Sequence, residues 1–287
     1  MKLEKDLRST DGITRKFVHV TEDNFRIEGT YVNYFNKHIV CFATQIGCSG
    51  RCVFCANGLA NRFHRNLTTI EMVLQCQSII NEVNTHDTSF MQKPILFSAM
   101  GCGDPLLNSV YVCDAFKSLN AKYPHSKFAL ATTGRLEQEL QLMLDNISGM
   151  EIRFKPTISL HSADDYKRRI LLPGAGFLDE LMPIMAKYQI HSPHKTREAD
   201  YNVVLFDGIN DSREDALRIY SLLSSYRLIP LSTVKINKYN PVDGSSVKPS
   251  QRQYEFVEYL RYLNVNVEIY ETNGVDIGAA CGQLINY

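Results

Sequence analysis

The sequence lacks several features that would place it in other classes of protein. None of its apolar runs approaches the roughly 18 residues needed to cross a bilayer. The N-terminal stretch MKLEKDLRSTDG is charged from its second residue, unlike a secretion signal. No internal repeat or low-complexity tract is present. We therefore expect a cytoplasmic globular protein with no membrane partner, and its 287 residues suffice for one large domain.

Net charge is also lacking, since 31 basic residues balance 31 acidic ones. No overall field would attract nucleic acid, so an RNA contact would need a local basic patch. A solvated face is the alternative interpretation of such a run of charges. The candidates for a patch are Arg51, Arg62, Arg65, Lys167, Arg168 and Arg169.

Eight cysteines are present, and in the cytosol they are expected to be ligands, catalysts or core residues rather than structural disulfides. The stretch CFATQIGCSGRCVFCANG contains Cys48, Cys52 and Cys55 in the pattern CxxxCxxC. Three such thiolates can bind three irons of a four-iron cluster and leave the fourth iron open to a chelating substrate. A structural zinc site usually needs a second closely spaced pair, which is missing, so the pattern favours the cluster. Cys76 and Cys113 fall in helical patterns and are expected in the core.

After residue 40 the chain alternates short β-type runs with helical patterns, which indicates an α/β fold with about six strand–helix units around a parallel sheet. Residues 1–37 contain a candidate hairpin at 25–37 and form an extension, and residues 38–287 form the core. The expected strands are 38–45, 94–101, 127–134, 154–161, 200–206, 233–240 and a closing strand at 264–272. The expected helices are 68–84, 109–122, 135–147, 177–189, 211–226 and 250–263.

The helix at 68–84 has the clearest signals. Thr68 and Glu71 fit a capping box. Its expected apolar stripe consists of Ile70, Val73, Leu74, Ile80 and Val83, with Cys76 on the same face.

Polar residues and glycines follow several of these strands, at the face where parallel barrels build their sites. Gly101 and Gly103 would let the backbone approach a ligand, and Asp104 could pair with an amino group. Ser159, His161 and Asn240 end otherwise apolar strands.

CxxxCxxC with Phe54 before its last cysteine resembles the radical S-adenosylmethionine (SAM) superfamily. The resemblance implies a partial (β/α)6 TIM-type barrel, a [4Fe-4S] cluster on Cys48, Cys52 and Cys55, and SAM on the open iron. From about Glu28 to Leu284 the chain further resembles the RlmN/Cfr family of RNA adenine methyltransferases. The matching stretches are HRNLT, GCGDPLLN, LATTG, ISLH, YNP and DIGAACGQL.

This second resemblance implies a function and roles for named residues. The enzyme would methylate carbon 2 of an adenine in rRNA or tRNA, using two SAM molecules and a flavodoxin- or ferredoxin-type electron donor. Cys281 would carry the methyl group and become crosslinked to the RNA, Cys41 would attack the Cys281 sulfur and release the product as a disulfide, and Glu28 would remove the ring proton. The residues expected to bind SAM are Gly103, Asp104, Thr133, Ser159, Leu160, His161 and Asn240.

The chain departs from the family pattern at Cys102, Asp104 and Ala131. Cys102 is expected near the cluster, and Thr133 would replace a hydrogen bond that Ala131 cannot make. The family's additional N-terminal domain is expected to be missing, and the protein is expected to be monomeric. Two alternatives stay open, namely the same mechanism on a substrate other than RNA, and a non-enzymatic iron–sulfur or zinc protein.

Overall fold

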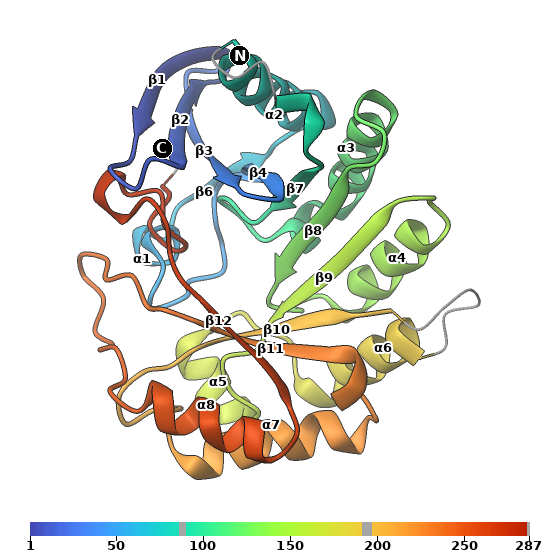
Figure 1. The fold of residues 1–287 in the computed structure, drawn as a ribbon, viewed down its shortest axis with the longest axis vertical. Coiled ribbons are helices and arrows are strands. Elements are labelled where there is room, and N and C mark those ends of the chain that lie inside the picture. Colours follow the sequence, from blue (N-terminus) through green and yellow to red (C-terminus); the bar gives the residue numbers. More distant parts are fainter. Residues whose placement is uncertain (86–89, 191–196, 286–287) are drawn as a thin grey trace.

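The computed structural model describes residues 1–85, 90–190 and 197–285. In these ranges one sheet has the strand order β1-β2-β3-β4-β7-β8-β9-β10-β11-β12, and the strands from β4 onward pair in parallel. The two ends of this order do not meet, so the barrel stays open, as Figure 1 shows. The expected partial barrel is therefore confirmed. Its parallel strands are β4 (Lys37–Cys41), β7 (Ile95–Ala99), β8 (Lys127–Thr132), β9 (Arg153–Ser159), β10 (Ala199–Val204), β11 (Ser232–Asn237) and β12 (Asn266–Tyr270).

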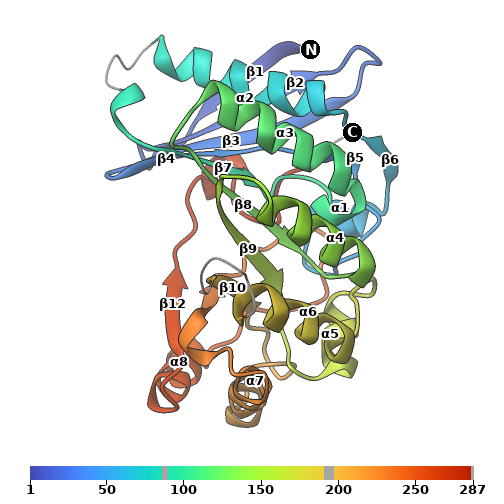
Figure 2. The same cartoon turned by 90° about the vertical axis from the view of Figure 1, so that its right-hand side faces the viewer.

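A helix follows each parallel strand from β4 to β11, which gives the six predicted units. Neighbouring helices pack against one another along the outer side of the sheet, as the two views in Figures 1 and 2 show. All seven strands and six helices predicted after residue 37 are present, with ends shifted by a few residues. The helices are α2 (Thr69–Asn84), α3 (Ser109–Lys122), α4 (Glu137–Ser148), α6 (Leu178–Ile190), α7 (Arg213–Ser225) and α8 (Gln253–Tyr262).

The N-terminal extension is larger than the hairpin expected at 25–37. It consists of three antiparallel strands, β1 (Lys2–Arg8), β2 (Thr14–Val20) and β3 (Arg26–Tyr34), and β3 pairs with β4. The stretch 25–37 thus supplies one strand and a turn, and its partners lie on both sides of it. Because β3 and β4 share a ladder, the sheet runs without a break through the predicted boundary at residue 37.

Helix α2 begins with the predicted capping box, in which the Thr68 hydroxyl and the Glu71 backbone and side chain bond one another. The predicted apolar stripe is wrong in its first half, because Ile70 is 70% exposed and Leu74 42% exposed. The buried face runs through Met72, Gln75, Cys76, Ile79, Ile80 and Val83. Two helix faces that differ by about one residue show the same spacing of apolar side chains. The spacing alone therefore did not decide which face of α2 is buried.

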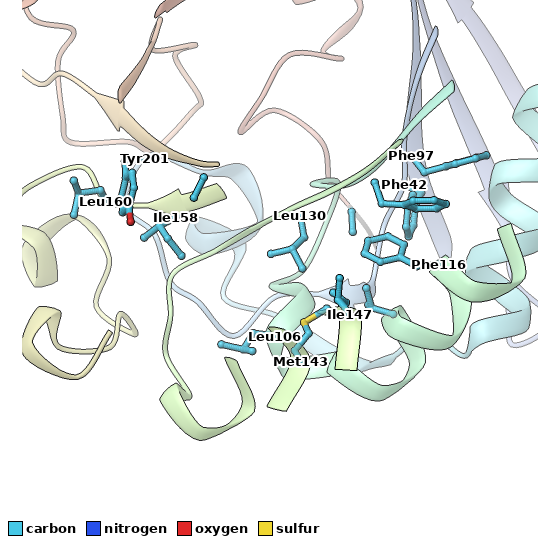
Figure 3. Packing of buried hydrophobic residues seen from close by; sticks show 14 of the residues in the cluster. Phe42, Phe97, Leu106, Phe116, Leu130, Met143, Ile147, Ile158, Leu160 and Tyr201 are labelled. Atoms are coloured by element: carbon cyan, nitrogen blue, oxygen red, sulfur yellow. The ribbon is translucent and has the colours of Figure 1, made fainter. Parts of the chain in front are cut away.

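The main core lies between the sheet and the helices, as Figure 3 shows. Phe42 meets Phe116 edge-on with ring centroids 6.4 Å apart, and Phe97 stacks on Phe128 at 5.6 Å. Each such buried ring contributes about 1.5–3 kcal/mol relative to an exposed one. Cys76 and Cys113 are buried among the core residues, as predicted. Within the described ranges no helix is long and apolar enough to span a membrane.

Candidate active site

The three cysteines of CxxxCxxC lie on the loop between β5 (Gln45–Gly47) and α1 (Ala56–Ala60), two elements too short for sequence patterns to reveal. Gly47 has φ +74°, and a Cβ there would lie 1.9 Å from the carbonyl oxygen of Arg62, so only glycine fits. The Cys48 amide donates to that same carbonyl at 2.8 Å. This contact with the residues before β6 (Phe63–Asn66) sets where the loop starts.

Glycine at position 50 leaves room between two of the thiols. A Cβ on Gly50 would lie 3.3 Å from the Cys48 sulfur and 3.6 Å from the Cys52 sulfur. Burial raises the pKa of Cys48 to about 11. Burial, followed by the charges of Cys55 and Cys48, raises the pKa of Cys52 well above its usual range. Burial raises the pKa of all three thiols, so they form a donor set that a cationic cluster would stabilise as thiolates.

This donor set fits a four-iron cluster better than a single ion. No group of three histidine, cysteine or acidic side chains in the described residues is placed to hold one metal ion. In a four-iron cluster the three thiolates bind three different irons, so they need not converge on one point. Cys102 is nearby and buried, and its thiol donates to the Gly47 carbonyl at 3.3 Å.

The loop after β7 carries Gly103 and Asp104. Gly103 has φ +99°, and a Cβ there would lie 2.7 Å from the Gln45 side chain. Asp104 is buried, and one carboxylate oxygen accepts from the Thr133 amide at 3.0 Å and from the Thr133 hydroxyl at 2.8 Å. Its other oxygen caps Leu106 at 3.1 Å. The Thr133 hydroxyl is thus used by Asp104, and its expected role in place of Ala131 stays a prediction.

The residues at the end of β9 are held by the buried guanidinium of Arg168. It donates to the backbone carbonyls of Leu160 at 3.2 Å, Thr133 at 2.7 Å and Ser159 at 3.3 Å, and also to that of Gly176. Arg168 is fully buried, so its predicted place in a basic surface patch is wrong. It instead ties the ends of β8 and β9 together, in the segment where the SAM-binding residues were predicted.

His161 has structural partners in this arrangement. Its Nδ1 accepts from the Val204 amide at 3.1 Å, and its ring lies 4.9 Å from the ring of Phe54. Burial and the charge of Arg168 lower the pKa of His161 to about 3, so the ring is neutral. These contacts are those of a satisfied structural histidine, and its predicted role toward SAM stays a prediction.

The segment after β12 folds back over the cysteine loop, which brings residues far apart in the sequence together. The Asn240 amide donates to the Cys281 carbonyl at 3.0 Å, and the Ala56 amide donates to the Gly282 carbonyl at 2.8 Å. The Asn57 side chain donates to the Leu284 carbonyl. The folded-back segment therefore rests on α1, directly beside Cys55.

This folded-back segment brings Cys281 close to Cys41. Cys41 ends β4 and pairs with Thr30 on β3 and with Ser98 on β7. Burial and the charge of Cys281 raise the pKa of Cys41 to about 12. The Cys281 residue is exposed, yet its thiol is shielded from water, and burial followed by the charge of Cys55 raises its pKa to about 11. All eight cysteines are free, so the disulfide implied by the family resemblance is not formed here.

Glu28 lies on β3 beneath the same segment. Its carboxylate pairs with the Lys16 ammonium at 2.8 Å and accepts from the Ile285 amide at 2.9 Å. Lys16 also donates to the Gly278 carbonyl at 3.2 Å. Sequence reasoning missed Lys16, although opposite charges on adjacent antiparallel strands were a usable signal.

The predicted basic patch is only partly exposed. Arg65 pairs with Asp23 and Glu71 at 2.7 and 2.8 Å, and Lys167 pairs with Asp215 at 2.7 Å. With Arg168 buried, the patch as predicted is wrong. The members that remain exposed are Arg51, Arg62 and Arg169.

No protein-family model matches the chain, but it is similar to several known proteins over most of its length. A protein of Thermosipho melanesiensis named "Probable dual-specificity RNA methyltransferase RlmN" is 32% identical over 285 residues, which cover 94% of this chain and 76% of the relative. A protein of the same name from Cytophaga hutchinsonii is 28% identical over 285 residues, covering 96% and 73%. A crystal structure of a radical SAM methyltransferase from Sphaerobacter thermophilus superposes with a TM-score of 0.84 at 27% identity, covering 99% of this chain and 80% of that one.

Proposed function

The chain belongs to the RlmN family of RNA methyltransferases, and from this premise we propose that it methylates an adenine ring carbon of RNA by radical SAM chemistry. We propose rRNA or tRNA as the substrate and carbon 2 of an adenine as the methylated position. The observation that carries the proposal is that the segment around Cys281 folds back onto the stretch that holds Cys41 and Cys55, where the Ala56 amide donates to the Gly282 carbonyl. A purely structural iron–sulfur protein would have no need for a folded-back segment that brings a fourth and a fifth thiol to the cluster loop.

Cys48, Cys52 and Cys55 would hold the cluster, which when bound supplies the electron that cleaves SAM to a 5′-deoxyadenosyl radical. Gly103, Asp104, Thr133, Ser159, Leu160, His161 and Asn240 are the proposed SAM-binding residues. Asp104 keeps one lone pair, on Oδ1, for a ligand ammonium beyond its bonds to Thr133 and Leu106. Arg168 holds the backbone of Ser159 and Leu160 in place beside it.

Cys281 would accept a methyl group from one SAM molecule. That methyl group would lose a hydrogen atom to the 5′-deoxyadenosyl radical, and its carbon would then bond to the ring carbon of the adenine. Cys41 would attack the Cys281 sulfur to release the product, which forms a disulfide between the two residues during turnover. Glu28 would take the ring proton. Burial raises the pKa of both thiols, so each must lose its proton in order to react.

Cys41→Ala tests the proposal directly. Removing Cys41 blocks release but not addition, so the purified variant should carry a covalently attached RNA fragment through Cys281. Denaturing gel electrophoresis and mass spectrometry before and after nuclease detect the adduct. Cys281→Ala should carry none, because it lacks the methyl carrier, and Cys113→Ala is the matched control for loss of a buried thiol remote from the site.

Two outcomes would decide against parts of the proposal. Turnover of Cys41→Ala at the wild-type rate with no adduct would reduce Cys41 to a strand residue. An adduct that is not RNA would keep the mechanism and assign it to another substrate. We also propose that a flavodoxin- or ferredoxin-type protein donates the electron and that the enzyme is a monomer.

A further inference from the structure

A cavity of about 430 Å³ is lined by one proposed cluster ligand, Cys48, and by none of the residues proposed to handle the methyl group. We propose that it binds one nucleotide of the RNA that flanks the target adenine, with its phosphate on Arg51 and Arg135 and its base on Phe63. The inference rests on the proposed function. The lining residues are Cys48, Ser49, Arg51, Asn61, Phe63, Arg135, Pro173 and Gly174.

The lining carries two positive charges and no acidic residue. Arg51 is exposed, and no acidic partner accompanies it among the ion pairs of the described residues. Arg135 donates only long hydrogen bonds, at 3.4 Å to the Ser49 carbonyl and 3.3 Å to the Ser49 hydroxyl. By contrast, Arg65 on β6 pairs with two carboxylates, those of Asp23 and Glu71. The chain as a whole has no net charge, yet two guanidiniums line this one cavity without a carboxylate, which favours a negatively charged ligand. The planar guanidinium matches the geometry of phosphate.

An aromatic ring beside these charges favours a nucleotide over a simple anion. Phe63 is 47% exposed on β6, next to the Asn61 amide. Single-stranded RNA is recognised by stacking unpaired bases on such rings, while arginines contact the backbone. The volume lies within the range of small-molecule sites.

Two backbone features keep the cavity open. A Cβ on Gly174 would lie 3.5 Å from the Arg135 guanidinium nitrogen and 3.4 Å from the Gly50 carbonyl oxygen, so a side chain there would fill the space between them. Arg51 holds a left-handed backbone with φ +54°, which non-glycine residues rarely adopt outside functional loops.

The position of the cavity identifies which nucleotide it would bind. Cys48 lines it, but Cys41, Cys281 and Glu28 do not. The target adenine must reach those three residues, so the cavity takes a neighbour in the strand. An acidic electron-transfer protein is the competing occupant of a basic surface beside a cluster, but a concave site with an aromatic wall fits an extruded base better than a flat docking face.

The test compares holoenzyme carrying Arg51→Ala and Arg135→Ala together with wild type and with Arg252→Ala, an exposed arginine outside the cavity. A fluorescein-labelled single-stranded RNA is titrated at several KCl concentrations. The two guanidiniums together neutralise one phosphate, so the double variant should lower the slope of log K against log[KCl] by about 0.7. Arg51→Lys with Arg135→Lys should keep most of the slope because it keeps the charges. Phe63→Leu should weaken affinity about fivefold or more without changing the slope.

Methylation is measured in parallel with dithionite and with flavodoxin as reductant, as a ratio to reductant-dependent SAM cleavage, which also reports an intact cluster. The ratio should fall in the double variant with both reductants. An unchanged RNA affinity and slope would overturn the proposal, and loss of activity with flavodoxin alone would assign the cavity to the electron donor. If the wild-type protein neither binds nor methylates RNA, the proposed function itself is wrong. If the wild type methylates RNA and the variants behave like it, only the proposal for the cavity is wrong.

Discussion

Lys16→Met should destabilise the protein through Glu28, the proposed general base. The ammonium and the carboxylate are 2.8 Å apart, and their side chains are 10% and 6% exposed. Removing one partner of a buried pair leaves an uncompensated charge and costs about 3–5 kcal/mol, whereas replacing both partners with neutral groups is often close to neutral. The Ile285 amide still donates to Glu28 at 2.9 Å, which favours the lower end of that range.

The assay is anaerobic urea unfolding of the holoprotein followed by circular dichroism. Lys16→Met should lower the free energy of unfolding by about 3 kcal/mol, and Lys16→Met with Glu28→Gln should recover most of the loss. Lys117→Met is the control, because its pair with Asp114 lies 3.3 Å apart with both side chains at least half exposed and contributes under about 1 kcal/mol. A loss no larger than that of Lys117→Met, or no recovery in the double variant, would refute the reasoning.

Three further outcomes are expected. Changing Cys48, Cys52 and Cys55 together to alanine should abolish iron binding and SAM cleavage, and iron content equal to that of wild type would contradict the cluster assignment. Peptide mass spectrometry of protein from cells with ample SAM should find a methyl group on Cys281, and a methyl group solely on another cysteine would reject the mechanism. Burial lowers the pKa of His19 from 6.5 to about 4. Between these two pH values the unfolded state binds a proton that the folded state does not. The free energy of unfolding should therefore fall by about 3 kcal/mol as the pH drops from 6.5 to 4. His19→Phe should remove this part of the pH dependence in urea unfolding, and equal pH slopes for the two proteins would disprove the account.

The N-terminal strands have a role beyond extending the sheet. The Asp276 carboxylate accepts from the Ser9 hydroxyl at 2.6 Å and from the Thr10 amide at 2.8 Å, and the Gly274 amide donates to Asp11 at 3.0 Å. Together with Lys16 these contacts fasten the segment that carries Cys281. The extension therefore positions the proposed methyl carrier, which a boundary drawn at residue 37 would obscure.

The local features of the protein could be predicted from its sequence. Alternating apolar runs specified the seven parallel strands and six helices, because helical and strand periods are properties of short windows. The spacing of Cys48, Cys52 and Cys55 likewise indicated a cluster site without reference to distant residues.

Which distant groups come together, and which charged side chains stay exposed and unpaired, became visible only in the folded chain. Arg168 and Arg169 are adjacent in the sequence, yet one is buried against backbone carbonyls and the other is exposed. Arg135 was absent from the expected patch, but folding places it across a cavity from Arg51. The reason is physical, since the burial and pairing of a charge depend on contacts between segments far apart in the chain, and no local pattern encodes them.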